Sequence, residues 1–383
     1  MKGTGRAWIE LDINNLCHNV NVVRKRLPGT CQIMASVKAD AYGHGAVGFC
    51  RELNTLGVRA FCVAAVLEGV ELRKHHIEGE ILILGYTHPE QFPLLIKYDL
   101  TQTVLDLDYA EMLNGFGEKF IVHIKIDTGL HRLGERSENL DRIIRIFECE
   151  NLNITGIYTH LIAENNGETE KIFTQEQLER FHHVCTEIKE HGFNLPRTHI
   201  QNSYGLLDRP DLAFDYVRIG RILYGTLNDP GDADKYGVEL RPVLSLKARV
   251  GAIKTVLAGE YIGYGFSYIA PKDMRIAVLA IGYADGLPRN LSHGVGHVLI
   301  DGQRAPVLGD ICMDQTIVDI TDIAKVVRGD IAVIIGRSGK AETTACDIAA
   351  QAGTISTEIL GRLGIRLERY KINKVTISVC EFF

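Results

Sequence analysis

Eight short apolar runs in the first 220 residues constrain the fold of this chain most strongly. Most consecutive runs are separated by a stretch in which apolar residues recur at helical spacing. Nearly continuous apolar strands that alternate with helices are typical of a parallel sheet covered on both faces. Eight such units within roughly 200 residues favour a (β/α)8 barrel over an open doubly wound sheet. The runs are 32–37, 60–65, 81–85, 103–105, 120–127, 154–160, 198–203 and 215–220.

The pattern changes after about residue 237, where runs of alternating apolar and polar residues are separated by Gly and Asp turns. These runs are 243–250, 276–281, 297–300, 316–320 and 332–335. Alternation of this kind predicts a mostly antiparallel β domain. We therefore expect a barrel over residues 1–237 and a β domain over 238–383, with residues 1–12 able to pair with the second domain.

Composition excludes several classes of function. The net charge is -6, so the chain lacks the basic surface that DNA, RNA or an anionic membrane would need. No run approaches the roughly 18 uninterrupted apolar residues of a membrane span. The basic N-terminus leads into an acidic strand, which is not the pattern of a signal peptide. The nine cysteines form no C-x-x-C pair, so we expect neither zinc nor disulfides, and a reducing, cytoplasmic compartment.

Polar residues end or directly follow several predicted strands, where (β/α)8 barrels carry their chemistry. They are Lys38, Lys125, Arg132, His160, Asn202, Ser203, Arg218 and Gly220. Any one of them is compatible with a structural role, but so many cations on one rim indicate an anionic ligand. Ser203 and the backbone amides near Gly220 suit a phosphate, and Tyr42 adds a hydroxyl donor. A lysine beside a phosphate site is what pyridoxal phosphate needs, because the lysine amine bonds covalently to this cofactor.

Nine motifs, in order along nearly the whole chain, resemble those of the alanine racemases. These are fold-type III pyridoxal-phosphate enzymes with a barrel and a C-terminal β domain. The motifs are VKADAYGHG (37–45), KIDTG (125–129), RLG (132–134), GIYTH (156–160), NS (202–203), VRIG (217–220), GYG (263–265), IGYADG (281–286) and GDICMD (309–314). Each motif is weak alone, and their order makes the resemblance specific.

The resemblance implies a racemase that uses two bases. Lys38 would hold pyridoxal phosphate and act as one base, and Tyr264 of a partner subunit would act as the other. Racemisation needs this arrangement, because one group removes the α-proton and another returns it from the opposite face. A homodimer with shared active sites follows. On the residues alone, Tyr264 is also compatible with an ordinary turn between two glycines.

Further roles are implied by the same resemblance. Arg218 would face the pyridine nitrogen, which would stay unprotonated because arginine keeps its own proton. His160 would support Arg218 and Tyr264, and Arg132 would bind near the ring hydroxyl and the substrate carboxylate. Carbamylation of Lys125 would turn one of several repelling cations into an anion.

The remaining site residues are also assigned by resemblance. Contacts to the cofactor are expected from Tyr42, His160, Asn202, Ser203, Arg218, Gly220, Arg221 and Thr357. Contacts to the substrate are expected from Arg132, Met313, Tyr283, Cys312 and Thr357. Arg221 stands where a small aliphatic residue is more usual in the family, and nothing in the sequence explains it.

Thr357 departs from the family pattern, because alanine racemases usually have tyrosine there. The loss of a ring predicts a larger, more polar pocket that favours a hydroxymethyl over a methyl group. One small group is worth only about 1–3 kcal/mol of discrimination, so activity on both alanine and serine is expected. His131 and Leu287 are also similar to the serine-racemising branch, which includes the catalytic domains of membrane-bound racemases of vancomycin-resistant bacteria. We expect a cytoplasmic enzyme, or the cytoplasmic domain of a membrane-anchored one, that supplies D-amino acids for peptidoglycan.

Two other readings stay open at this stage. Barrel-type amino-acid decarboxylases share the fold but place an acidic residue opposite the ring nitrogen, so Arg218 counts against them. Non-catalytic carriers of pyridoxal phosphate lack the β domain, so Tyr264 and the last 140 or so residues count against that class.

Overall fold

The computed structural model describes residues 3, 5–162, 167–229 and 231–373. It separates into two compact units. One comprises Met1–Val20, Tyr42–Gly45 and Arg221–Phe383, and the other comprises Asn21–Ala41 and Ala46–Gly220. Compactness is not a test of independent folding, so the domain boundary expected at residue 237 stays a prediction.

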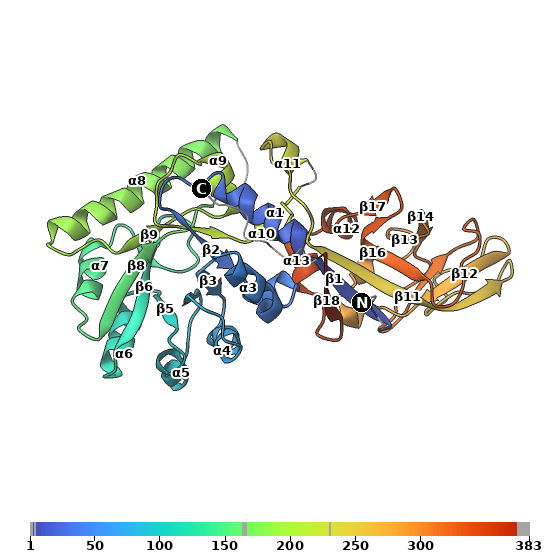
Figure 1. Ribbon diagram of the computed structural model, residues 1–383, viewed down its shortest axis with the longest axis horizontal. Helices are drawn as coiled ribbons and strands as arrows, with labels where there is room; N and C mark the ends of the chain where they lie inside the picture. The colour runs from blue at the N-terminus through green and yellow to red at the C-terminus, as the bar shows by residue number, and fades with distance from the viewer. Residues whose placement is uncertain (1–2, 4, 163–166, 230, 374–383) are drawn as a thin grey trace. The chain divides into compact units, whose positions relative to one another are not determined.

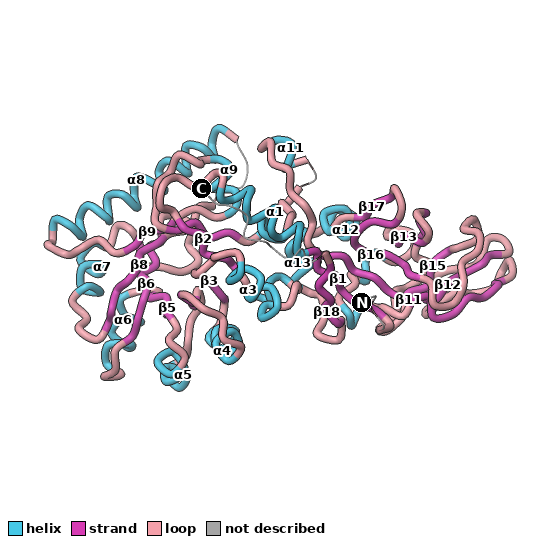
Figure 2. The backbone as a smooth tube through the Cα atoms, in the orientation of Figure 1, coloured by secondary structure: helices cyan, strands magenta, loops and turns pink. Residues whose placement is uncertain are grey.

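The second of these units is a closed barrel of eight parallel strands, which confirms the predicted fold class (Figures 1 and 2). Each strand pairs with the next along the chain, β5 pairs with β6, and β10 pairs with β2 to close the ring. The strands are β2 (Gln32–Ser36), β3 (Ala60–Val63), β4 (Glu80–Ile83), β5 (Thr101–Val104), β6 (Phe120–Asp127), β8 (Leu152–Tyr158), β9 (Arg197–His199) and β10 (Tyr216–Ile219). The short strand β7 (Glu135–Arg136) adds to the end of β6.

Helices cover the outside of this barrel (Figure 1). They are α3 (Ala46–Thr55), α4 (Val66–Lys74), α5 (Phe92–Lys97), α6 (Leu107–Gly115), α7 (Leu140–Phe147), α8 (Glu168–Glu190) and α9 (Ser203–Asp208), and helix α1 (Ile13–Arg24) precedes β2. Helix α8 begins as early as Glu168. The reason is a cap, in which the Glu170 carboxylate accepts a hydrogen bond from the Gly167 amide at 2.7 Å. Amides at the start of a helix have no acceptor within the helix, and this contact provides one.

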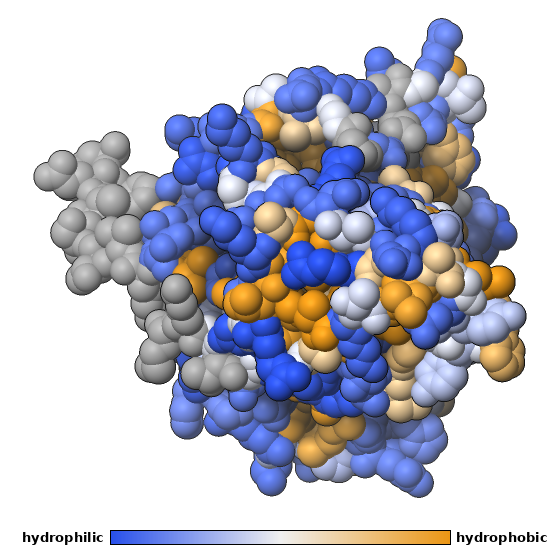
Figure 3. Space-filling view, turned by 90° about the vertical axis from the view of Figure 1, so that its right-hand side faces the viewer, coloured by the Kyte–Doolittle hydropathy of each residue, from blue (hydrophilic) through white to orange (hydrophobic). Residues whose placement is uncertain are grey.

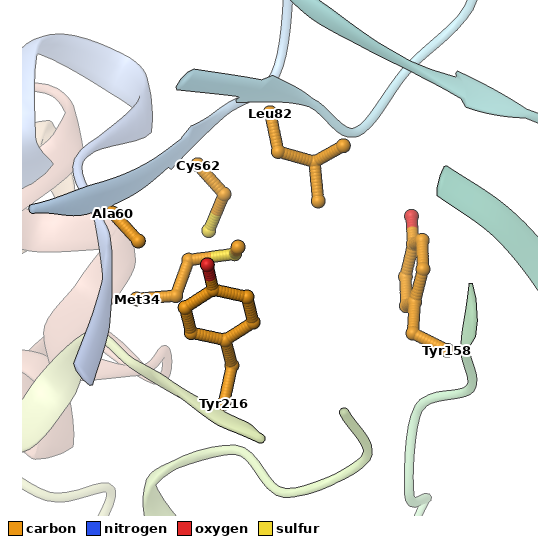
Figure 4. Packing of buried hydrophobic residues seen from close by; sticks show 6 residues of the cluster. All are labelled: Met34, Ala60, Cys62, Leu82, Tyr158 and Tyr216. Carbon is orange, nitrogen blue, oxygen red and sulfur yellow. The ribbon is translucent and has the colours of Figure 1, made fainter. Parts of the chain in front are cut away.

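The interior of the barrel is a packed core rather than a pore. Side chains from β2, β3, β4, β8 and β10 meet there and are almost completely buried (Figure 4). They are Met34, Ala60, Cys62, Leu82, Tyr158 and Tyr216. Burying one large apolar side chain contributes roughly 1.5–3 kcal/mol, so these alternating inward positions hold the eight strands together.

The other unit is built on a mostly antiparallel sheet, again as predicted. Its main strand order is β14-β13-β16-β11-β1-β18, and β12 pairs with both β11 and β15. The N-terminal strand β1 pairs antiparallel with β11 and parallel with β18. The strands are β1 (Ala7–Asp12), β11 (Leu244–Val256), β12 (Met274–Leu279), β13 (His297–Ile300), β14 (Gln303–Pro306), β15 (Thr316–Asp319), β16 (Ile331–Ser338), β17 (Ala341–Thr343) and β18 (Glu368–Ile372).

Short helices complete this unit: α10 (Arg221–Tyr224), α11 (Asp232–Lys235), α12 (Ala345–Ala352) and α13 (Ser356–Gly361). Helix α12 has a capping box, in which the Thr344 hydroxyl accepts from the Asp347 amide at 3.0 Å and the Asp347 carboxylate accepts from the Thr344 amide at 2.7 Å. Gly353, with φ of +69°, ends the helix. These caps fix the direction in which the chain enters α13, the helix that carries Thr357.

The surface of the protein carries both apolar and hydrophilic side chains. Apolar side chains gather near the centre of the face drawn in Figure 3, and hydrophilic side chains border them. Within the described ranges, no helix is long and apolar enough to cross a membrane. No disulfide joins the eight cysteines that the structure describes, and Cys380 lies outside the described residues.

Candidate active site

Lys38 begins an unusual turn directly after the first barrel strand. Four consecutive residues after it, Ala39, Asp40, Ala41 and Tyr42, have φ between +50° and +53°. Left-handed backbone costs about 1–2 kcal/mol per non-glycine residue, so other contacts must hold this turn. The Glu68 carboxylate accepts from the Ala39 amide at 2.6 Å, and the Asp40 carboxylate accepts from the Ala46 amide at 2.7 Å. This left-handed backbone could not be predicted from the residues themselves, because alanine favours a right-handed helix.

Arg218 is the third of the four residues of strand β10, near the strand end where the sequence places it. Its guanidinium is buried over the ring of Tyr158. Both Nη atoms are occupied by hydrogen-bond acceptors: His199 Nδ1 at 2.8 Å, the Thr159 carbonyl at 2.8 Å, the Ile200 carbonyl at 2.9 Å, His160 Nδ1 at 3.0 Å and the His199 carbonyl at 3.1 Å. No partner for Nε is found in the described part of the chain. One N–H donor of a rigidly held arginine is therefore left for a ligand.

His160 shows that the predicted cations share one region of the barrel. Its pKa lies well below the ordinary value, because burial disfavours a charged imidazole and nearby positive charges disfavour it further. Those charges belong to Arg218, Arg132, Lys125 and Lys38. The histidine is therefore neutral at physiological pH, and its Nδ1 accepts from Arg218.

Lys125 is buried in strand β6 with its ammonium near the ring of Tyr158. Burial lowers its pKa to about 8, and repulsion from Arg132 and Arg218 adds to this effect. A lysine with this pKa is partly uncharged near neutral pH. The uncharged amine is the form that reacts with carbon dioxide.

We expect Lys125 to make the stability of the protein rise with pH. Its folded pKa of about 8 lies below the ordinary 10.5, so the unfolded chain binds more protons between these values and unfolding becomes harder as pH rises. The free energy of unfolding should increase by on the order of 3 kcal/mol across this window. Urea denaturation in carbon-dioxide-free buffers, with Lys125→Met as the comparison, measures the effect. An equal increase in both proteins would contradict it.

The loop that carries Arg132 is held by Asp127. Its carboxylate accepts from the Gly129 and His131 amides, both at 3.0 Å, and contacts His131 Nδ1 at 3.1 Å. Burial alone would raise the pKa of Asp127, but these hydrogen bonds outweigh burial and lower it. Arg132 itself is exposed, so its side chain is free to meet a ligand.

Asn202, Ser203 and Gly220 form a second group of predicted residues. Asn202 caps helix α9 by accepting from the Gly205 amide at 2.8 Å. The Ser203 hydroxyl accepts from the Gly220 amide at 3.3 Å and is buried. The structure thus brings together the hydroxyl and the backbone amide that we expected to bind phosphate. Asn202 has the separate task of starting the helix that presents Ser203.

Three predicted residues lie in elements of the other unit. The rings of Tyr42 and Tyr224 lie 4.8 Å apart, and Arg221 begins α10. Thr357 lies in α13, which packs closely on the turn at Gly43. A Cβ at Gly43 would lie 2.1 Å from the Leu360 carbonyl oxygen, and φ there is +76°, so only glycine fits.

Tyr283, Cys312 and Met313, all expected to contact the substrate, are adjacent. The Tyr283 amide donates to the Cys312 carbonyl at 3.0 Å, and the Ala284 amide donates to the Met313 carbonyl at 3.0 Å. The side chains of Tyr283 and Met313 remain 41% and 53% exposed, so they present a surface rather than fill a core.

Asp285 holds this pair of loops in place, a role that the sequence analysis missed. Its buried carboxylate forms ion pairs with Arg6 Nη2 at 2.6 Å and with Arg366 Nη2 at 3.0 Å. It also accepts a hydrogen bond from the Gly282 amide at 3.0 Å. Arg366 also pairs with Asp314, next to Met313, at 2.9 Å. A buried carboxylate needs such partners. The sequence signal that could have indicated this role is an acidic residue within the mostly apolar segment IGYADG (281–286).

Tyr264 lies on an exposed loop of this unit. Its side chain is 72% exposed, and Gly263 and Gly265, with φ of +81° and +72°, shape the turn on either side of it. Phe266 is 76% exposed and its ring lies 5.0 Å from that of Tyr261. Within the described residues no hydrogen bond reaches the Tyr264 hydroxyl. A cluster of exposed aromatic residues on one loop indicates a surface that meets a partner.

The fold and these groups define a (β/α)8-barrel enzyme of the kind that holds an anionic cofactor beside a lysine. Two family models match the chain: the alanine racemase N-terminal domain over residues 11–228 and the alanine racemase C-terminal domain over 243–371. The chain therefore belongs to the alanine racemase family, whose enzymes depend on pyridoxal phosphate. This confirms the resemblance, the enzyme class and the cofactor at the level of the family.

Curated relatives fall into two groups by length. An amino-acid racemase of Enterococcus faecalis is 44% identical over 95% of this chain, and a serine/alanine racemase of Enterococcus gallinarum is 36% identical over 94%. The chain spans only about half, 51%, of the length of these two proteins. An alanine racemase of Nostoc is 39% identical, and 95% of each chain is covered.

Solved structures agree in fold over almost the whole chain. Alanine racemase of Clostridium difficile superposes with a TM-score of 0.90 at 36% identity, covering 97% of this chain and 98% of that one. Alanine racemase of Bartonella henselae, solved with covalently bound pyridoxal phosphate, gives a TM-score of 0.82 at 29% identity, covering 96% of this chain and 100% of that one.

Proposed function

We propose that this chain is a pyridoxal-phosphate-dependent racemase that interconverts the enantiomers of alanine and of serine. The observation that carries the proposal is Arg218, whose two Nη atoms are held by the protein while Nε is left to donate to a ring nitrogen. A racemisation assay across the proteinogenic amino acids tests it. Carbon dioxide release from lysine, ornithine or diaminopimelate, without racemisation, would instead support a decarboxylase.

The residues present fit pyridoxal phosphate. We assign the covalent bond to the Lys38 amine and the phosphate to Ser203 and the Gly220 amide, which already lie together. Tyr42, Asn202, Arg221 and Thr357 are proposed as further neighbours of the cofactor. When bound, the cofactor supplies an electron-withdrawing ring that stabilises the charge left when the α-proton is removed.

Two side chains would move the α-proton. The Lys38 amine would hold a proton on one face of the substrate. The Tyr264 hydroxyl of a second copy holds a proton on the other face. Removal by one group and return by the other inverts the α-carbon, and retention results only if the same group does both.

Arg218 would limit how strongly the ring withdraws electrons. Its guanidinium keeps its own proton and would donate to the ring nitrogen, so that nitrogen would not gain a proton and the ring would withdraw electrons less strongly. Side reactions would be suppressed as a result. His160, neutral and bonded to Arg218 at 3.0 Å, keeps the guanidinium in position.

The substrate carboxylate would meet Arg132 and the Met313 amide, and Tyr283 and Cys312 would line the approach. We also propose that Lys125 is carbamylated, because its lowered pKa leaves a reactive amine in a surplus of positive charge. Nuclear magnetic resonance with ¹³C-labelled bicarbonate detects such a carbamate directly.

A homodimer is part of the proposal. The exposed aromatic loop that carries Tyr261, Tyr264 and Phe266 supports it, since a second copy would cover these rings and receive Tyr264 at its own cofactor. Mixing two inactive variants, Lys38→Ala and Tyr264→Phe, tests the shared site. Recovery of activity on mixing is expected, because a heterodimer contains one site with both bases.

Thr357→Tyr is expected to lower the ratio of kcat/KM for serine to kcat/KM for alanine by about 10-fold or more. A tyrosine ring would crowd the space that a hydroxymethyl group needs and would remove a polar partner. Steady-state kinetics with both substrates measures the ratio. Ile355→Tyr, on the exposed residue two positions earlier, is the control. An unchanged ratio in Thr357→Tyr would contradict the proposal that Thr357 makes room for a hydroxymethyl side chain.

We place the enzyme in the cytoplasm and propose that it supplies D-amino acids for peptidoglycan. The reduced cysteines support the compartment. The similarity to the serine/alanine racemase of Enterococcus gallinarum supports the inclusion of D-serine among its products, and we propose a role of the vancomycin-resistance type.

A further inference from the structure

Four polar side chains form a continuous chain through the interior of the barrel, and we call it the polar chain. It runs from Arg218 in β10 through His199 in β9 and His123 in β6 to Glu80 in β4. Arg218 Nη1 lies 2.8 Å from His199 Nδ1, His199 Nε2 lies 3.0 Å from His123 Nδ1, and His123 Nε2 lies 2.8 Å from Glu80 Oε1. Both histidines are completely buried, so no water competes for these contacts.

A donor at one end of the polar chain and a carboxylate at the other agree on the position of every proton between them. A guanidinium only donates, so His199 Nδ1 must accept and its proton must reside on Nε2. His199 Nε2–H then donates to His123 Nδ1, which leaves the proton of His123 on Nε2. That nitrogen lies 2.8 Å from Glu80 Oε1, a close electrostatic contact that is not aligned as a hydrogen bond, and its N–H dipole favours an ionised carboxylate there. The two hydrogen bonds and this contact are polarised in one direction, from Arg218 to Glu80.

The far end of the polar chain is anchored firmly. Glu80 Oε2 contacts Arg197 Nη2 at 3.1 Å and accepts from the Tyr216 hydroxyl at 3.0 Å. Burial alone would raise the pKa of Glu80, but its contact with His123 and its other partners lower it, so the carboxylate is charged at neutral pH. Glu80 begins β4 and lines a cavity of about 720 Å³ at the N-terminal ends of the strands, opposite the loops that follow them.

Arg218 needs such an anchor. It is buried, and no carboxylate contacts it in the described ranges. An uncompensated buried charge is costly, and the polar chain joins it to the negative charge of Glu80 through two polarised imidazoles. Tyr158 packs flat on His199, with ring centroids 4.6 Å apart, and restricts the histidine to this plane.

We propose that Glu80 is a positioning residue for Arg218. By setting the tautomers of His123 and His199, it fixes which way the guanidinium turns and so aims Nε toward the ring nitrogen of the cofactor. This inference rests on the proposed function for the role of Arg218. Its first consequence, the two tautomers, holds whether or not the chain is a racemase.

Glu80→Gln separates this role from simple packing, because the amide has the same shape. Its oxygen is expected to accept from Arg197 and Tyr216, which leaves the amide NH2 facing His123. His123 Nε2 must then become an acceptor, and its proton moves to Nδ1. His199 would follow and place an N–H against Arg218 Nη1, so the guanidinium must turn.

The test combines imidazole ¹⁵N resonance spectra, recorded without substrate, with steady-state kinetics. In the wild type, both histidines should carry the proton on Nε2. In Glu80→Gln, His123 should carry it on Nδ1, and kcat should fall about 10-fold with little change in KM, the order expected for a partner that orients a catalytic group. Glu78→Gln is the matched control, because Glu78 lines the same cavity but is exposed and faces Arg59.

Two outcomes overturn the proposal. One is a His123 that keeps its proton on Nε2 in Glu80→Gln, and the other is a kcat within twofold of the wild type while the tautomer moves. Circular dichroism confirms that the variant is folded, and Glu80→Leu, which should leave His123 in a mixture of tautomers, provides a second variant. A wild type without racemase activity refutes the proposed function, and the spectra still decide the role of Glu80.

Discussion

Lys38→Ala should lose the visible absorption of bound pyridoxal phosphate and at least about 10⁴-fold of its racemase activity. Two functions disappear together, because the same amine anchors the cofactor and moves a proton on one face of the substrate. The backbone of the turn should survive, since its hydrogen bonds come from Glu68 and Asp40 and not from the lysine side chain. Absorption spectra and racemisation rates of the purified variant measure both effects.

Lys119→Ala is the control for this experiment, because Lys119 is an exposed lysine in the same unit. It should keep both the absorption band and the activity. A Lys38→Ala protein that still binds the cofactor covalently would show that another lysine, such as the partly uncharged Lys125, is the true attachment site. That result would contradict the assignment drawn from the strand end.

Tyr264→Phe should lower kcat/KM for racemisation about 10³-fold while leaving the cofactor band unchanged. The loss must be equal in both directions, because two enantiomers have the same free energy and the ratio of the two kcat/KM values is therefore fixed at one. Exchange of the α-proton with deuterium oxide should behave differently. It should persist for the enantiomer whose proton faces Lys38 and cease for the other, which nuclear magnetic resonance can follow.

Tyr261→Phe is the matched control, three residues away on the same exposed loop and 57% exposed. It loses a hydroxyl of the same kind and should retain full activity. If Tyr264→Phe exchanged the α-protons of both enantiomers at wild-type rates, Lys38 alone would serve both faces. The two-base mechanism would then be wrong.

The strands of the barrel could be predicted because their signal is local. Most of these strands contain a run of apolar residues that is visible without knowledge of its neighbours, and the mostly polar strands β5 and β9 are the exceptions. The first residue of α8 was harder to predict, because a cap formed by Gly167 and Glu170 decides where the helix begins, and apolar periodicity does not. The left-handed turn after Lys38 could not be predicted at all, because contacts from Glu68 and Asp40 outweigh the preference of its alanines.

The candidate site was predictable to the extent that it follows the strand ends. Ser203 and Gly220 end two different predicted strands, and they were expected to lie close together. In the structure the Gly220 amide donates a hydrogen bond to the Ser203 hydroxyl. Arg218 was also expected at a strand end, but its buried partners, which are imidazoles and carbonyls, could not be predicted. The roles of Lys38, Tyr264 and Thr357 stay predictions for the experiments above.

The sequence by itself determined the two architectures, the family and the residues most worth testing, since periodicity and ordered motifs are properties of the chain alone. Only the tertiary structure decided which side chains share protons and charge. Glu80, His123, His199 and Arg218 are separated by up to 138 residues, which is the interval from 80 to 218. Closure of the barrel brings them within hydrogen-bond distance, and in that buried interior each proton position follows from the next.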